Sequence, residues 1–233
     1  MPVPAIGMRP LAILVAFAAT LASTPARATC VPITSGLPGW ERLDFEKVPP
    51  NTWTEEGGAL VASSNATSSI LYAGVPSETA PVLTWRWRVD RAAPPTDLTR
   101  KGGDDRSLSL TVGFAYDPIQ ATMGEKMKRM VVESMAGADA PGRVIEFAWG
   151  GTGAAGVPAA SPYSGSSGRI VTLRPATDPT GQWQTERVDL AALYRQIWGG
   201  TPPPVTRVAL LTDSDDTGGA TEARIADICF EGG

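Results

Sequence analysis

Short runs in which apolar and polar residues alternate, separated by turn-forming residues, occur along most of the chain. The clearest run is 83–89, where four apolar residues alternate with Thr84, Arg86 and Arg88. Because side chains alternate between the two faces of a strand, one face is predicted to lie in a core and the face with the arginines in water. The run 107–114 repeats the pattern. Further strands are predicted at 144–149, 169–174, 206–212 and 224–230, with weaker candidates at 41–45, 59–62 and 70–73.

Two segments have helical periodicity. Within residues 118–136, apolar side chains recur at spacings of mostly three and four, which predicts an amphipathic helix inserted between strands. We interpret this apolar stripe as packed against the edge of a sheet, and the alternative is an adaptable binding surface. A shorter helix is predicted near 189–197. The residues of the first stripe are Met123, Met127, Met130, Val131 and Met135.

Glycine and proline are frequent and punctuate the alternating runs. The 233 residues include 25 glycines and 21 prolines. Many short strands separated by turns are typical of an all-β domain. We therefore predict a single domain over 29–233 that is a two-sheet antiparallel jelly-roll sandwich with one or two short helices. The Gly-, Ser- and Pro-rich stretch 150–168 is predicted to be a flexible loop.

The first residues have the features of a secretory signal peptide. One basic residue, Arg9, precedes the apolar run Leu11–Leu21, and Ala26–Ala28 provides a small-x-small cleavage site. We predict a signal peptide over 1–28 and export to the periplasm or the medium. The apolar run is too short to span a bilayer and no later stretch is long enough, so no transmembrane segment is expected.

The two cysteines, Cys30 and Cys229, lie near the two ends of the predicted exported chain. In an oxidising compartment they are expected to form a disulfide. Such a bond would require the first and last segments of the domain to lie side by side.

Composition excludes several kinds of chemistry. The chain has no histidine, which removes Ser-His-Asp and Cys-His nucleophile systems and imidazole-based zinc sites. Its formal net charge is −4 and it has no long basic run, which argues against nucleic acid as a partner. No cofactor is required by any motif.

Acidic residues gather in two segments. Asp104 and Asp105 lie in a loop between strands and are candidates for ligand or cation binding, with a turn stabilised by ion pairs as the alternative. Asp213, Asp215 and Asp216 follow a predicted strand and suggest a structural calcium site, with a solvated turn as the alternative.

A second arrangement of acids would depend on the disulfide. If the ends of the domain meet, Asp44 or Glu46 would approach Asp227 and form an alternative metal site.

The face of the strand that carries Arg86 and Arg88 is the predicted ligand surface. Glu146, expected on a neighbouring strand, would face these arginines, a combination suited to sugar hydroxyls or sugar carboxylates. Cross-strand ion pairing is the alternative. Three tryptophans, at 85, 87 and 149, are expected in the core, whereas those at 40, 53 and 198 are candidate stacking platforms.

Several ordered motifs, taken together, resemble a bacterial exported family catalogued as domain of unknown function 3047. The resemblance covers roughly residues 37 to 230 and implies no assigned activity. The order of elements is also similar, at the level of the fold only, to jelly-roll carbohydrate-binding modules. The motifs are 83–89, 101–105, 181–183, 212–218 and 226–230.

These observations favour a non-catalytic module that binds a glycan, an envelope polymer or another polar polymer through Arg86, Arg88 and the Asp104–Asp105 loop. A carboxylate-based polysaccharide hydrolase or lyase, pairing Glu146 with Asp104 or Asp105, is the first alternative. The second is an envelope structural or protein-interaction domain that works through the methionine-bearing helix. The sequence does not specify the oligomeric state.

Overall fold

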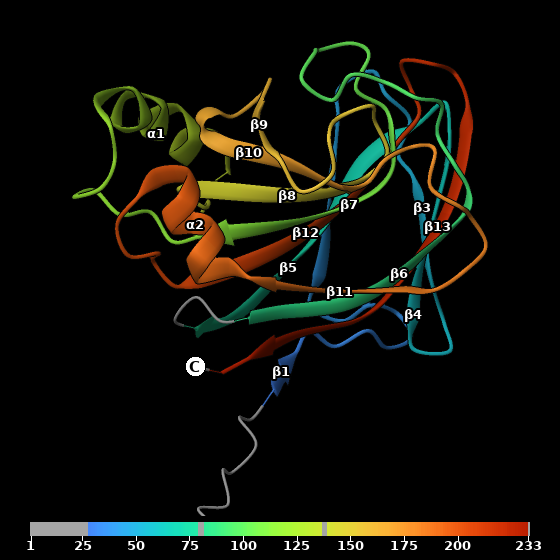
Figure 1. The fold of residues 1–233 in the computed structure, drawn as a ribbon, viewed down its shortest axis with the longest axis horizontal. Coiled ribbons are helices and arrows are strands. Elements are labelled where there is room, and N and C mark those ends of the chain that lie inside the picture. The colour runs from blue at the N-terminus through green and yellow to red at the C-terminus, as the bar shows by residue number, and fades with distance from the viewer. Residues whose placement is uncertain (1–27, 79–81, 137–138, 233) are drawn as a thin grey trace, which may run out of the picture.

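Two β-sheets packed face to face form the body of the protein, with two helices at one end (Figure 1). The computed structural model describes residues 28–78, 82–136 and 139–232. The predicted signal peptide therefore lies almost entirely outside the described residues. Neither helix in the described ranges is long and apolar enough to cross a membrane.

Sheet A has six strands in the order β11-β6-β13-β4-β3, with β1 alongside β13. All of its strand pairs are antiparallel. Its strands are β1 (Ala28–Cys30), β3 (Thr52–Glu56), β4 (Ala59–Asn65), β6 (Val82–Arg91), β11 (Gln184–Asp189) and β13 (Ala220–Glu231).

Sheet B has seven strands in the order β2-β5-β12-β7-β8-β10-β9. One pair in it, β8 with β10, is parallel, so the sheet is mixed where the sequence predicted antiparallel strands throughout. Its strands are β2 (Trp40–Asp44), β5 (Ser68–Glu78), β7 (Arg106–Phe114), β8 (Arg143–Trp149), β9 (Pro158–Ser161), β10 (Gly165–Arg174) and β12 (Val205–Asp213).

The predicted strands are present, and the all-β sandwich is confirmed. The expected loop over 150–168 contains β9 and the start of β10, because β9 folds back and pairs with β10. Strands β1, β3 and β11 were not predicted, because their residues are mostly polar, exposed or half-buried.

The core lies between the sheets and is centred on large aromatic side chains. Trp85, Trp87 and Trp149 are at most 1% exposed, as the alternation predicted. Ring centroids of Trp85 and Phe147 lie 5.4 Å apart, and those of Trp87 and Trp149 lie 5.5 Å apart. The outward residues of β6 alternate with these core positions, which leaves Arg86 and Arg88 on the outer face of sheet A.

Helix α2 (Leu190–Trp198) packs on the core as expected. The side chain of Asp189 caps its start by accepting a hydrogen bond from Ala192 N. Leu190 and Tyr194 are buried, and Gly199 ends the helix with a φ of 74°.

Helix α1 (Met123–Ala136) is oriented opposite to our interpretation. Its methionines at 123, 127 and 130 are 70–74% exposed, and its polar side faces the protein. The reason is a set of buried polar contacts: Glu125 pairs with Arg143 at 3.0 Å, and Arg129 donates to Ala140 O. Our interpretation that the methionine stripe packs on a sheet edge is therefore wrong for these three residues. The side chain of Met135 lies outside the described residues.

The disulfide between Cys30 and Cys229 is confirmed. The two residues face each other in the β1–β13 ladder, which places the start of the described chain beside its end (Figure 1). Strand β1 has only three residues, so the covalent link supplements a short ladder. Disulfides of this kind are typical of proteins outside the cytoplasm.

We predict that removing this bond with Cys30→Ser and Cys229→Ser lowers the free energy of unfolding by about 2–5 kcal/mol. The bond joins residues 199 positions apart, so its loss releases a large loop in the unfolded chain. Urea unfolding of both proteins measures the difference. If the urea midpoint of the double variant equals that of the wild type, the disulfide of β1 contributes nothing to stability.

Candidate functional site

A hollow of about 520 Å³ lies on the outer face of sheet B. Its floor is formed by residues that alternate with core positions, among them Ile70, Val144 and Leu211. Polar residues line the end where β7 starts and β12 stops. This end carries the residues Asp104, Arg106, Glu146, Asp213, Asp215 and Asp216.

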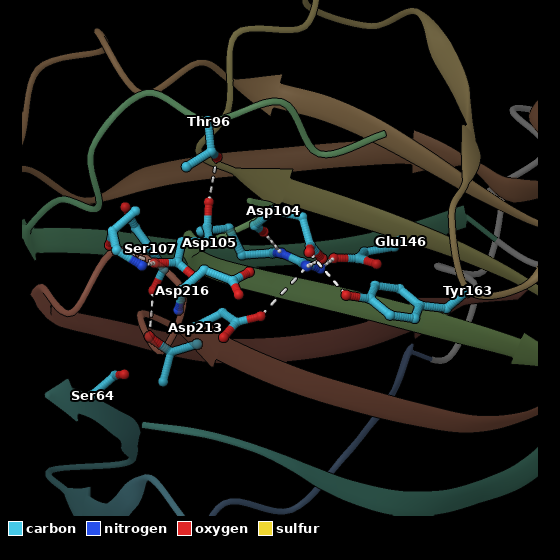
Figure 2. A network of polar contacts seen from close by, with 12 residues as sticks. Ser64, Thr96, Asp104, Asp105, Ser107, Glu146, Tyr163, Asp213 and Asp216 are labelled. Carbon is cyan, nitrogen blue, oxygen red and sulfur yellow. Dashed lines mark hydrogen bonds and ion pairs between the residues drawn. The ribbon is translucent and has the colours of Figure 1, made fainter. Parts of the chain in front are cut away.

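A fully buried guanidinium, that of Arg106, is at the centre of the polar end. Its Nη2 donates to Asp104 Oδ2 at 2.6 Å and its Nη1 donates to Glu146 Oε1 at 2.5 Å. Asp213 Oδ2 lies 3.6 Å from Nη2. Figure 2 shows these carboxyl groups turned toward one point. Burial opposes the charge of Arg106, but the three carboxyl groups outweigh it and raise its pKa above the ordinary value.

A β-bulge places Arg106 in this position. Leu211 of β12 pairs with Ser109 of β7, and Asp213, two residues further on, pairs with Arg106, which is three residues from Ser109. The register between the two strands therefore shifts by one residue at this point. Simple alternation would turn residue 106 to the core side with Leu108. The extra residue in β7 turns Arg106 to the outer face instead, where Glu146 also lies.

Asp105 points away from this centre and organises a neighbouring loop. Its carboxylate accepts hydrogen bonds from the backbone N–H of Thr217 at 2.8 Å and of Asp216 at 3.3 Å, and from the Thr217 hydroxyl. Thr96 donates to the carbonyl of Asp105 (Figure 2). Adjacent Asp104 and Asp105 thus have different tasks, as expected for neighbours on an extended chain.

Tyr163 forms one rim of the hollow. Its hydroxyl donates to Asp104 Oδ1 at 2.9 Å, while the residue is 60% exposed. Burial of the hydroxyl, followed by this hydrogen bond, raises its pKa above the ordinary value. Lys101 Nζ lies 5.2 Å from the ring centroid.

Two smaller hollows continue the first one along the sheet. One of about 390 Å³ shares Ile70, Thr111, Val144 and Ala209 with it, and one of about 230 Å³ shares Val144 and Tyr163. We call the three together the sheet-B groove. It is acidic and deep at the Arg106 end and more apolar toward Leu43 and Pro141.

The predicted ligand residues do not converge. Arg86 and Arg88 lie on sheet A, whereas Glu146 lies on sheet B, so the expectation that Glu146 occupies a strand beside them is wrong. Arg86 pairs with Asp227 and lies over the ring of Trp183, and Arg88 pairs with Asp90. Asp227 reaches Arg86 because a bulge in β13 gives it a φ of 55°. Asp104 and Glu146 do meet, through Arg106.

The metal candidates are rearranged in a similar way. Among the described residues, a single group of three potential ligands lies within mutual reach, and it joins Asp105 to Asp215 and Asp216 rather than to Asp213. A calcium ion at the acidic turn stays a prediction.

The alternative metal residues are not part of that group. Glu46 Oε1 lies 3.7 Å from Lys47 Nζ, and the carboxylate of Asp44 pairs with the guanidinium of Arg42. Asp227 is engaged by Arg86 on the other sheet.

The candidate stacking tryptophans pack against the core. Trp40, Trp53 and Trp198 are partly buried against the core. Trp40 Nε1 donates to Pro32 O, and Trp198 Nε1 donates to Ser166 O.

Asp213 is the most perturbed acid of the groove. It is 7% exposed, and its Oδ1 has no hydrogen-bond partner within the described ranges. Burial and the neighbouring carboxyl of Asp215 raise its pKa to about 9, against the opposing effect of Arg106. Burial and Asp215 also raise the pKa of Asp216.

Residues 38–229 match the model of the family described as protein of unknown function DUF3047. The chain therefore belongs to this family. The predicted resemblance is confirmed, and it brings no activity with it. No curated protein matches the chain.

Solved structures of similar fold include carbohydrate-binding modules and adhesin domains. A family 29 carbohydrate-binding module variant in complex with cellulohexaose is 12% identical, with a TM-score of 0.42 over 91% of this chain and 94% of that chain. An adhesin domain of Lys-gingipain from Porphyromonas gingivalis is 12% identical, with a TM-score of 0.36 over 84% and 92%.

The residues that sequence reasoning missed are Arg106 and Tyr163. Arg106 directly precedes the predicted strand 107–114, and the alternation assigns it no role. Tyr163 lies in the glycine- and serine-rich stretch that was expected to be a loop. A signal was present for Arg106, namely the density of acids in 104–105 and 213–216, which favours a cation nearby. That signal did not point to Tyr163.

We predict that Asp213→Asn stabilises the protein more at pH 8 than at pH 5. A carboxyl group whose pKa is about 9 when folded and 3.8 in its ordinary state binds its proton more tightly in the native protein. Its contribution to stability is therefore greatest at low pH and falls as the pH rises through this window. The amide cannot ionise, so the advantage of the variant grows by up to about 1.4 kcal/mol per pH unit.

Urea unfolding at both pH values measures this difference. Glu56→Gln removes one exposed carboxylate from β3 and serves as the control for loss of a charge. If Asp213→Asn and wild type differ by the same amount at pH 5 and pH 8, the perturbed pKa is refuted.

Proposed function

We propose that the protein is an exported, non-catalytic module that binds a glycan chain along the sheet-B groove. The observation that carries this proposal is the continuity of the groove, in which three hollows share residues of neighbouring strands. An elongated groove suits several consecutive units of a polymer better than a single small molecule.

The lining of the groove combines apolar and polar surfaces. Sugar rings have apolar C–H faces and hydroxyl edges, so both kinds of surface have a counterpart on a sugar. Ile70, Val144 and Leu211 form an apolar floor, and Tyr163 adds an aromatic rim with a polar tip. Carboxylates such as Glu146 can accept hydrogen bonds from hydroxyl groups in a partly desolvated site.

The opposite sheet offers less for a ligand. Arg86 and Arg88 are engaged by Asp227 and Asp90, and a ligand there would have to replace those ion pairs. Their ligand-binding role stays a prediction that the same experiment can test.

We predict that Tyr163→Ala weakens retention by glycans about tenfold, whereas Arg86→Ala does not. Loss of an aromatic side chain that packs on the ligand is expected to cost about 1 kcal/mol or more of binding free energy, and Arg86 lies on the far sheet. Native affinity electrophoresis through gels with a panel of polysaccharides measures retention. Retention that is lost in Arg86→Ala and kept in Tyr163→Ala would move the binding face to sheet A. No retardation on any polysaccharide would reject the glycan proposal.

Hydrolysis or elimination is a second candidate function, favoured by one feature of the cavity. Glu146 and Asp213 both approach the guanidinium of Arg106 and line the same hollow. Because its pKa is raised to about 9, Asp213 holds a proton at neutral pH and is able to donate it to a glycosidic oxygen.

If the protein is catalytic, a retained polysaccharide should shorten during incubation, and both Glu146→Gln and Asp213→Asn should stop the shortening. The size of each polymer after incubation is measured by gel filtration. A polymer that binds and keeps its size supports the non-catalytic module. Equal shortening by wild type and both variants would exclude these two carboxyl groups as the catalytic pair.

A further inference from the structure

At its Arg106 end, the sheet-B groove has an excess of acidic groups. Five carboxyl groups line its largest hollow, and two guanidinium groups oppose them. Asp105 adds a further carboxylate directly behind Asp215 and Asp216. The carboxyl groups are Asp104, Glu146, Asp213, Asp215 and Asp216, and the guanidinium groups are Arg106 and Arg169.

Arg106 has little charge left for a ligand, because it is enclosed by its own carboxyl partners and is 3% exposed. Arg169 donates to the neutral backbone carbonyls of Gly165 and Gly168, so it keeps its positive charge, but the carboxyl groups of this hollow outnumber it. Lys101 lies at the rim above Tyr163, and Lys128 borders the smallest hollow. The deepest part of the groove is therefore negative.

One buried oxygen in this region has no partner. Asp213 is 7% exposed and lines the hollow, and its Oδ1 makes no hydrogen bond to the described residues. A buried polar atom without a partner costs free energy, so a group supplied by a ligand would stabilise it. This unpartnered oxygen lies at the acidic end of the groove.

We propose that the groove selects a cationic ligand, and specifically a glycan whose sugar units carry free amino groups. This inference rests on the proposed glycan-binding function and specifies its substrate class. An ammonium group has three donors and no acceptor, which matches an acidic pocket with a free acceptor oxygen. A uronic acid polymer, by contrast, would bring negative charge to a negative site.

Two oligosaccharides with the same backbone test the proposal. A β-1,4-linked glucosamine hexamer and its fully N-acetylated counterpart differ only in the charge and bulk of the 2-substituent. Titration calorimetry at low salt and mildly acidic pH, where the 2-amino groups carry a proton, is expected to give at least tenfold tighter binding of the amine. The difference should shrink as salt is raised, because an electrostatic preference is screened.

Asp215→Asn identifies the groove as the source of the preference. Asp215 lines the hollow, and its half-buried side chain neighbours Asp213. The variant is expected to lose about three- to tenfold in affinity for the amine and nothing for the N-acetylated hexamer. Asp216→Asn, an exposed neighbour, is the second variant if the first is unstable. Glu56→Gln on sheet A removes the same charge far from the groove and should change neither affinity.

Each other outcome has a definite meaning. Equal affinity for both hexamers would keep the glycan groove and overturn the cationic preference, and so would an equal loss in Glu56→Gln. If neither hexamer nor any polysaccharide of the panel binds, the proposed function itself fails. If binding of the N-acetylated hexamer needs added Ca²⁺ and stops with a chelator, the acids serve a metal ion, and the amino-sugar proposal is overturned.

Discussion

The buried guanidinium of Arg106 is the constraint on which this side of the sandwich depends. A charge removed from water is tolerated only when charged and hydrogen-bonded partners surround it. Asp104 and Glu146 provide these partners from the loop before β7 and from β8, and the carboxyl group of Asp213 on β12 lies 3.6 Å away. One cation thus connects segments that are far apart in the sequence. The acids would repel one another without it.

Neutralising one guanidinium does not require so many carboxyl groups. Asp215 and Asp216 are beyond those that Arg106 contacts, and they border the open hollow. A stabilising network thus leaves an uncompensated negative potential at the surface of the groove. In a partly desolvated cleft such a potential is stronger than on an open surface, and it acts on the charge of whatever binds there.

Features of this structure that depend on local interactions could be predicted from the sequence, and features that depend on long-range interactions could not. Strict alternation in 83–89 placed Trp85 and Trp87 in the core because strand geometry is local. Which strands are neighbours depends on the whole sheet order, so the distance between Arg86 and Glu146 could not be predicted. The bulge in β7 likewise shifts the register by one residue and turns Arg106 outward, and alternation alone conceals such a shift. The predicted orientation of α1 was wrong for a related reason, because buried pairs such as Glu125 with Arg143 outweigh the hydrophobicity of its methionines.

Two buried aspartates of the same region show how structural and functional demands separate. Asp105 is fully buried, and its carboxylate is satisfied by backbone and hydroxyl donors of the loop that it holds. Asp213 is nearly as buried, yet one of its oxygens has no partner and its pKa is raised to about 9. A group of the second kind lowers stability at neutral pH, and an amide at the same place would not. Costs of this type are found where a protein holds a polar group ready for something that is not part of its own chain, and here the group faces the groove.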